Sequence, residues 1–255
     1  MTPQVKLLYL SNSGFLLTTE DNRKILIDPY LSKNPAAPFG PGDLPKLDLI
    51  MVSHAAFDHL GDAFDLAKKN QAPLLSDFLV KEMAYEAGVP KELVKSFSYG
   101  GVVQRAGVEI RALLAHHVSN AKLQNGQLAT GTPLAFLLTT SEGLRIHHMG
   151  DTCLFQDLKL VGQLYRPHIG LIPVGAAAPQ YGTDLPPNEA ALAAQWTGCE
   201  VAVPMHYCDG EQPLAFARAV ETMLPWMEVK QMIPGQELVF GVIKQGARTT
   251  FVESS

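Results

Sequence analysis

The amino-acid sequence predicts an α/β protein in which two mixed β-sheets pack together and helices cover their outer faces. Short apolar runs separated by turn residues open each half of the chain, and such runs are typical of β-strands. Segments with apolar residues at helical spacing follow the strands in each half. Strands followed by helices, twice along one chain, favour two packed sheets with helices outside.

The elements of the first half begin with three strands joined by tight turns, which predict an antiparallel meander. A loop rich in Pro and Gly follows, of the kind that often carries function. A pattern of alternating strands and helices then completes this half. In order, the predicted elements are strands Val5–Leu10, Gly14–Thr19 and Arg23–Asp28, the loop Ser32–Pro45, strand Leu49–Val52, helix Leu60–Lys69, strand Ala72–Leu75 and helix Asp77–Glu86.

The second half repeats this order. The polar, Gly-bearing segment Asn120–Thr132 is expected to be a mobile loop. Short strands are expected to close the chain. The other predicted elements are strands Val102–Arg105, Val108–His117, Leu134–Thr140 and Leu144–Met149, helix Gln156–Tyr165, strand His168–Val174, helix Pro187–Trp196, strand Glu200–Met205 and helix Pro213–Leu224.

Length and charge narrow the class of protein. A chain of 255 residues with 47% hydrophobic content can bury a large core, and we expect one domain over residues 1–255. Lys and Arg number 20 against 25 Asp and Glu, which gives a net charge of −5 without any block of like charge. A nucleic-acid partner therefore lacks its usual electrostatic support.

The cysteines and the apolar segments indicate a cytoplasmic protein. Cys153, Cys199 and Cys208 form no CxxC pair, which argues against a disulfide framework and a cysteine-built zinc site. The N-terminal segment lacks a basic leader, and no segment approaches the roughly 20 apolar residues of a membrane span. We expect no membrane association.

Histidines and two aspartates gather after the predicted strands. Because polar residues at the ends of several buried strands meet at a common rim, where α/β sheets place ligands, these positions predict one shared site. They are His54, Asp58 and His59 after one strand, His116 and His117 at the end of another, His147, His148 and Asp151 at a third, and His206 at a fourth.

Each histidine also has a structural interpretation, as a hydrogen-bonded or solvated residue. We accept it for His168, which stands apart from the others. Side chains alternate across a strand, so only one member of each adjacent pair should face the site. We expect His117 and His148 to point inward, with His116 and His147 as bystanders; the reverse parity stays open.

The residue types indicate metal chemistry. Neutral imidazole and carboxylate suit zinc, manganese or iron, and a bound metal lowers the pKa of its water until hydroxide is available near neutrality. No GxSxG, Walker A or GxGxxG motif offers another mechanism.

Several short motifs in order resemble the metallo-β-lactamase fold, and within it the uncharacterised metal-dependent hydrolases related to ascorbate-6-phosphate lactonases. They are SHAAFDHLGD, AHH, HHMGDT, PVG and VPMHY, joined by Ile27-Asp28-Pro29 and Asn188-Glu189-Ala190-Ala191. The resemblance extends from the first strand to Tyr207. It implies an αββα sandwich with metals in a cleft at one edge of the two sheets.

The resemblance also implies two metal positions. His54 and His117 belong to the first, Asp58, His59 and His206 to the second, and Asp151 bridges both. Ala56 stands where the HxHxDH motif of the family has its second histidine, and a methyl group cannot coordinate. We favour one tight metal at the second position, preferably zinc, with manganese or iron as alternatives. A weak first metal completed by waters remains open.

The leading hypothesis is a metal-dependent hydrolase of a small lactone, ester or amide. Asp58 or Asp151 would orient the attacking water, and His54 or His117 would protonate the leaving group. The rivals are a phosphodiester hydrolase and, because of Ala56, a non-catalytic metal- or metabolite-binding protein. Homo-oligomerisation stays open. The expected substrate walls are Ser32–Pro45 with Phe39, Asn120–Thr132, and Ala176–Pro186 with Tyr181.

Overall fold

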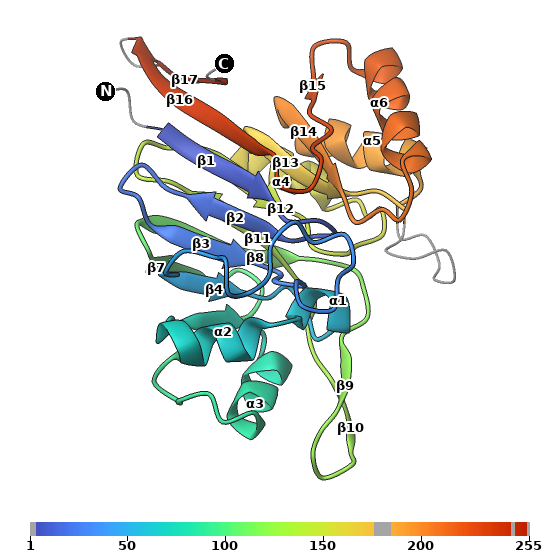
Figure 1. The fold of residues 1–255 in the computed structure, drawn as a ribbon. Coiled ribbons are helices and arrows are strands. Elements are labelled where there is room, and N and C mark those ends of the chain that lie inside the picture. Colours follow the sequence, from blue (N-terminus) through green and yellow to red (C-terminus); the bar gives the residue numbers. More distant parts are fainter. Residues whose placement is uncertain (1–3, 176–184, 246–247, 254–255) are drawn as a thin grey trace.

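Two β-sheets packed face to face form the centre of the computed structural model, which describes residues 4–175, 185–245 and 248–253 (Figure 1). The first sheet has the strand order β17-β16-β1-β2-β3-β4-β5-β6, and the second has the order β15-β14-β13-β12-β11-β8-β7. Helices lie on the outer face of each sheet. The predicted α/β class, with two mixed sheets and helices outside, is confirmed.

The first sheet is antiparallel from β17 to β3 and parallel from β3 to β6. Its first three strands along the chain form the predicted meander. The strands are β1 (Gln4–Tyr9), β2 (Phe15–Thr18), β3 (Lys24–Ile27), β4 (Leu49–Met51), β5 (Leu74–Ser76), β6 (Val94–Ser96), β16 (Glu237–Gln245) and β17 (Arg248–Glu253).

The second sheet is antiparallel from β7 to β12 and parallel from β12 to β15. Both sheets therefore contain parallel strands whose carboxyl ends face the same way within each sheet, which is where such sheets bind ligands. The strands are β7 (Val102–Arg105), β8 (Val108–Leu114), β11 (Leu134–Thr139), β12 (Arg145–His148), β13 (Ile169–Pro173), β14 (Val201–Met205) and β15 (Glu228–Val229).

The helices bury apolar faces against the sheets. Asp77 caps α3 by accepting a hydrogen bond from Val80 N, and Pro187 opens α5 with a preset backbone angle. In the described residues, no helix is long and apolar enough to cross a membrane. The helices are α1 (Phe57–Leu60), α2 (Ala63–Asn70), α3 (Phe78–Glu86), α4 (Leu158–Tyr165), α5 (Pro187–Thr197) and α6 (Glu211–Met223).

The largest apolar cluster lies between the two sheets. Phe15 of the first sheet and Phe136 of the second are fully buried in it. Separate clusters lie under α2 and α3 on one side and under α5 and α6 on the other. Because both faces of each sheet are buried over most of its width, the sequences of the strands are nearly continuous apolar runs.

Three local predictions differ from the structure. The segment expected as a mobile loop contains an antiparallel hairpin, β9 (Asn120–Lys122) and β10 (Leu128–Thr130), whose base is held by a hydrogen bond from Thr132 N to Asp77.

The helix expected over Leu60–Lys69 is split at Gly61. A side chain at Gly61 would place its Cβ 2.2 Å from the carbonyl oxygen of Pro29, and the backbone there has φ of 43°. Strand β6 was not predicted, because it has only three residues and one is buried.

His168 has the structural role predicted for it. Its Nδ1 accepts a hydrogen bond from the backbone N–H of Arg145 at 3.0 Å. Burial and the nearby guanidinium of Arg145 lower the pKa of His168 to about 4. The folded protein therefore favours the neutral ring, because protonation would remove the acceptor.

Stability should depend on pH through His168. Between about pH 6.5 and pH 4 the unfolded chain binds this proton and the folded chain does not, so the stabilisation is complete above pH 6.5 and is lost as the pH falls toward 4. Over this pH range, the free energy of unfolding in urea should fall by about 1 to 2 kcal/mol more for wild type than for His168→Gln. This figure allows for solvent screening of a partly exposed ring. His116→Gln, at an exposed histidine, should follow wild type; an identical pH profile for His168→Gln would contradict the assignment.

Candidate metal centre

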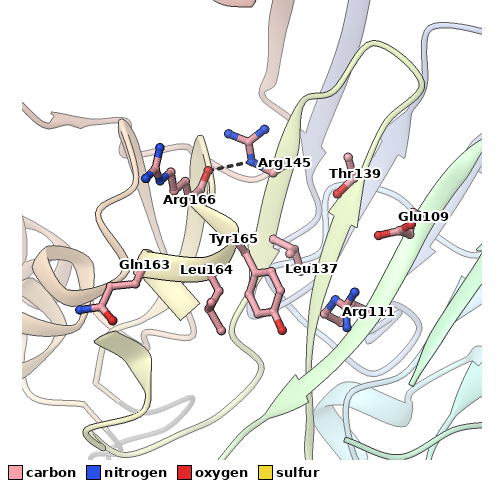
Figure 2. A pocket seen from close by; sticks show the side chains of 9 residues that line it. All are labelled: Glu109, Arg111, Leu137, Thr139, Arg145, Gln163, Leu164, Tyr165 and Arg166. Atoms are coloured by element: carbon pink, nitrogen blue, oxygen red, sulfur yellow. Dashed lines mark hydrogen bonds between the residues drawn. The ribbon is translucent and has the colours of Figure 1, made fainter. Parts of the chain in front are cut away.

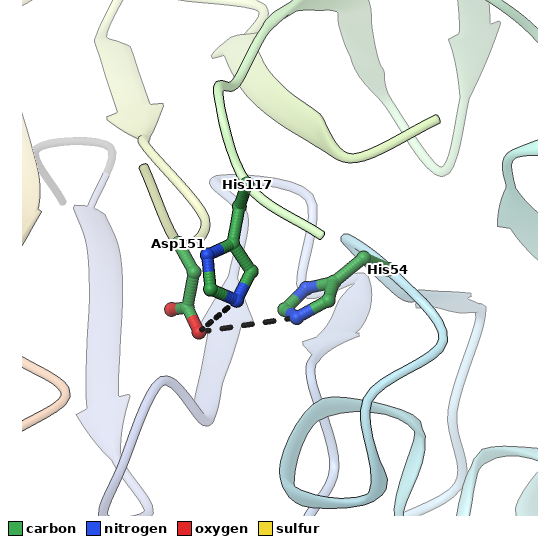
Figure 3. A group of neighbouring side chains, drawn as sticks. All are labelled: His54, His117 and Asp151. Atoms are coloured by element: carbon green, nitrogen blue, oxygen red, sulfur yellow. Dashed lines mark ion pairs between the residues drawn. The ribbon is translucent and has the colours of Figure 1, made fainter. Parts of the chain in front are cut away.

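The six predicted site residues meet where strands of both sheets end. His54, Asp58 and His59 follow β4, and Asp151 follows β12. The carboxylate of Asp151 is the common neighbour. Its Oδ2 lies near the Nε2 atoms of four histidines: His59 at 3.0 Å, His206 at 3.1 Å, His117 at 3.8 Å and His54 at 3.9 Å. Figure 3 shows two of these imidazoles converging on the carboxylate.

The donors fall into two groups, each with its ligand atoms within 4.8 Å of one another. One group is His54, His117 and Asp151, and the other is Asp58, His59 and His206. Asp151 Oδ2 also approaches two histidines of the second group, so that group has four donors and the first has three. This is the division that the family resemblance implied.

Of the adjacent residues His116 and His117, only one belongs to the cluster. Strand β8 ends at Leu114, so strand alternation does not govern His116 and His117. His117 joins the cluster, whereas the ring of His116 packs on Phe155 with centroids 4.5 Å apart. The prediction of His117 over His116 agrees with this geometry.

His148 lies beside the cluster and is not part of it. Its Nδ1 accepts a hydrogen bond from Gly150 N, which leaves Nε2–H to donate to the carbonyl of Ser13 at 2.9 Å. His148 thereby fixes the turn that carries Asp151. His147 is buried, and burial lowers its pKa to about 3.

Burial sets the charges of the cluster. Burial alone would raise the pKa of Asp58, but a hydrogen bond with His206 and the charge of His59 lower it to about 2. Burial would lower the pKa of His59, yet Asp151 and Asp28 raise it well above its usual value. Burial lowers the pKa of His54 to about 3, so this ring is neutral, the form in which imidazole binds metals.

This arrangement fits a divalent cation. Asp28, Asp58 and Asp151 are buried carboxylates, and in the described part of the chain only histidines form ion pairs with them. Among the described residues, Nε2 of His54 has no hydrogen-bond partner despite complete burial, and Asp151 Oδ2 lies 3.9 Å from it. Buried polar atoms without partners are rare and call for an explanation. Nitrogen and carboxylate donors of this kind suit zinc, manganese or iron.

Two residues orient the metal-facing histidines, and their roles were missed by the sequence analysis. Asp28 Oδ2 lies 2.7 Å from Nδ1 of His59, which turns Nε2 of that ring toward Asp151. Ser53 bonds Asp28 through both its backbone N–H and its hydroxyl, and its Oγ lies 3.0 Å from Nδ1 of His54. Carboxylate partners of this kind fix the tautomer of a ligating histidine. Both residues lie at strand ends, and this position is the one sequence feature that could have identified them as part of the site.

Asn12 is a third residue that the sequence analysis missed, since it lies in the predicted tight turn between the first two strands. Its side-chain N–H donates to the carbonyl of Asp58 at 3.0 Å and to the carboxylate at 3.3 Å. Its own carbonyl accepts hydrogen bonds from His206 N and from the Tyr9 hydroxyl. Asn12 therefore connects the first two strands to two members of the second donor group.

Ala56 begins α1, and its carbonyl accepts the first hydrogen bond of that helix, from Leu60 N. Its side chain offers no donor atom. The first donor group therefore relies on His54, His117 and Asp151 alone. His117 is also the most exposed of the six, with 26% of its side chain accessible.

Comparisons with known proteins agree with this geometry. A family model described as a beta-lactamase superfamily domain matches residues 23–207. UPF0173 metal-dependent hydrolases from Methanobrevibacter smithii and Rubrobacter xylanophilus are 34% and 32% identical to the chain, each over 91% of it and over 95% and 96% of the relative. A solved structure described as a novel metallo hydrolase from Ignicoccus hospitalis is 28% identical, with a TM-score of 0.77 over 93% of this chain and 98% of that one.

Fold and site together define a protein of the metallo-β-lactamase class. The chain belongs to the metallo-β-lactamase superfamily and, within it, to the UPF0173 metal-dependent hydrolases. The narrower link to ascorbate-6-phosphate lactonases stays a prediction.

Removing the charge of Asp28 should weaken metal binding without unfolding the protein. Asp28→Asn keeps the shape of the side chain but no longer holds the proton on Nδ1 of His59. We expect zinc affinity, measured by competition with a chromophoric chelator, to fall about 10- to 100-fold. Asp65→Asn, which removes the same charge from an exposed helix position, should bind zinc as wild type does. Unchanged affinity in Asp28→Asn would show that Asp28 does not orient a ligand.

Proposed function

We propose that this protein hydrolyses a small lactone, ester or amide with a divalent metal held by the six-residue cluster. The supporting observation is the position of Asp151, whose Oδ2 lies within 4 Å of the Nε2 atoms of four histidines from both sheets. We propose zinc as the metal, with manganese or iron as alternatives, and residues 1–255 as one domain.

Asp58, His59, Asp151 and His206 would hold the tighter metal, because they offer four donors with limited exposure. His54, His117 and Asp151 would hold a weaker one. When bound, a divalent metal lowers the pKa of a water molecule and polarises a substrate carbonyl.

The chain's own residues would position the reactants. Asp58 or Asp151 would accept a hydrogen bond from the attacking water and so fix its direction. When no metal occupies the first position, His117 would donate a proton to the leaving group, and its partial exposure favours it over the fully buried His54 for contact with substrate. Ser32–Pro45 with Phe39, which is 38% exposed, is proposed as one substrate wall. Residues 176–184, with Tyr181, lie outside the described residues.

Two other functions compete with this one. A phosphodiester hydrolase would use the same donors, and a non-catalytic metal-binding protein is suggested by Ala56. We propose a small-molecule substrate and no nucleic-acid partner, in line with the net charge of −5. Cysteines 153, 199 and 208 are free, which supports a reducing, cytoplasmic setting.

The donor count predicts one tightly bound zinc per chain. Mass spectrometry of the protein after gel filtration with modest zinc excess should give about one equivalent, because the first position has two donors of its own and shares Asp151 with the second. Ala56→His restores a fourth donor there and should raise the value toward about two.

Phe57→His is the matched control, because it adds a histidine at the next position, where the native side chain is 60% exposed. It should leave the stoichiometry at about one. Two equivalents in wild type would contradict the proposal of one tight site.

Turnover should depend on the second donor group. In a screen of lactones, esters, amides and phosphodiesters, His206→Ala should reduce the rate on any accepted substrate by at least about 100-fold with an unchanged circular dichroism spectrum. Asp65→Ala, on the exposed face of α2, should keep the wild-type rate.

The same screen separates the rival functions. Cleavage of phosphodiesters alone would favour the second enzyme class. Tight zinc binding with no turnover in wild type or in Ala56→His would favour the non-catalytic protein. Full activity in His206→Ala would refute the proposed site.

A further inference from the structure

A cavity lies on the outer face of the second sheet, beside the end of α4. Its volume is about 520 Å³, a size typical of small-molecule sites. Figure 2 shows the side chains that surround it, which come from β8, β11, β12 and the end of α4. They are Glu109, Arg111, Leu137, Thr139, Arg145, Gln163, Leu164, Tyr165 and Arg166.

Three of the chain's seven arginines line this cavity, although the protein is acidic overall. Glu109 is the one carboxylate in the lining, and it bonds the side chain of Gln104. No ion pair joins Arg111, Arg145 or Arg166 to a carboxylate within the described residues. The cavity therefore carries an excess of about two positive charges.

The guanidinium groups of Arg145 and Arg111 are held in place by neutral contacts. Arg145 donates from Nε to the carbonyl of Arg166 at 2.8 Å, which brings these two residues together (Figure 2). Arg111 lies over the ring of Tyr165, 5.0 Å from its centroid. Burial lowers the pKa of Arg145, Glu200 raises it, and the charge of Arg166 lowers it. Such preorganised forks match carboxylate and phosphate groups.

This cavity is separate from the metal centre. Arg145 is the first residue of β12, and the other end of that strand leads to Asp151. Across β11, Arg145 pairs with Thr139, whereas His148, beside the metal centre, pairs with Phe136. Leu137 packs with the α4 cluster and not with the core between the sheets, which places the cavity on the outer face.

We propose that this cavity, hereafter the arginine cavity, binds a small organic polyanion with two or more carboxylate or phosphate groups. Arg145 and Arg166 together receive one anionic group, and Arg111 receives another. Thr139, Gln163 and Tyr165 supply neutral donors, and Leu137 with Leu164 contacts the carbon skeleton. The cavity volume and the number of guanidinium groups favour a small molecule over an acidic peptide.

The test uses the full, zinc-loaded protein and isothermal titration calorimetry at constant ionic strength. The probes are tricarballylate, with three carboxylates, and fructose 1,6-bisphosphate, with two phosphates; whichever binds identifies the preferred group. We expect saturable binding of at least one probe, weakened about tenfold or more in Arg111→Gln and in Arg166→Gln. Thermal unfolding checks that both variants are folded, and probe-induced shifts of the Tyr165 ring resonances in wild type give a second measurement that needs no variant.

Two matched controls locate the binding. Arg218→Gln loses the same charge from the exposed face of α6 and should bind as wild type does. Asp151→Asn alters the metal centre and should also leave probe binding unchanged. Equal weakening in Arg218→Gln, loss of binding in Asp151→Asn, or absence of saturable binding by either probe would overturn the proposal. So would tighter binding of a Glu-rich peptide with the same dependence on Arg111 and Arg166.

Discussion

Three buried carboxylates impose the main constraint on this structure. Asp28, Asp58 and Asp151 lie where the two sheets end, and their ion pairs in the described part of the chain are with histidines. Burying a charge without a partner costs several kcal/mol, so this region is stable only with positive charge in its centre. Without metal, His59 supplies part of that charge, as its raised pKa shows. A divalent cation would offset two of the three negative charges and allow His59 to act as a neutral ligand.

The backbone around these carboxylates includes residues in an unfavourable conformation. Asp28 and His206 have φ of 46° and 58°, in the left-handed region that L-residues avoid at a cost of about 1 kcal/mol each. Ser53 and Asn12 then hold the carboxylates and rings in place. These contacts orient the donors of the second group independently of Ala56, which lacks a donor atom beside the first group.

Strand β12 connects two regions of opposite character. Its last residues lead to the acidic metal centre, and its first residue contributes to the arginine cavity. Side chains alternate along β11, so Phe136 faces the core between the sheets and Leu137 faces α4. The arginine cavity therefore lies on the outer face of the sheet. One sheet thus presents cation-binding and anion-binding groups on different surfaces, and neither neutralises the other.

The sequence by itself determined the layered fold and the meander at its start, and it grouped five of the six candidate site residues. Apolar runs specify buried strands, and polar residues directly after such runs have to meet at the sheet ends, so His54, Asp58, His59, Asp151 and His206 could be grouped without coordinates. The segment Asn120–Thr132 was misjudged because its hairpin depends on a remote contact, the bond from Thr132 to Asp77.

Only the tertiary structure decided which side chains support that site and where the arginine cavity lies. Asn12 and Asp28 reach their partners across 46 and 31 positions of sequence, and no local pattern encodes such contacts. The choice between His116 and His117 depended on where β8 ends. The three arginines are 21 or more positions apart along the chain and become neighbours only when β8, β12 and α4 pack together. Local sequence specifies which groups are present, whereas long-range packing decides their distances and therefore their chemistry.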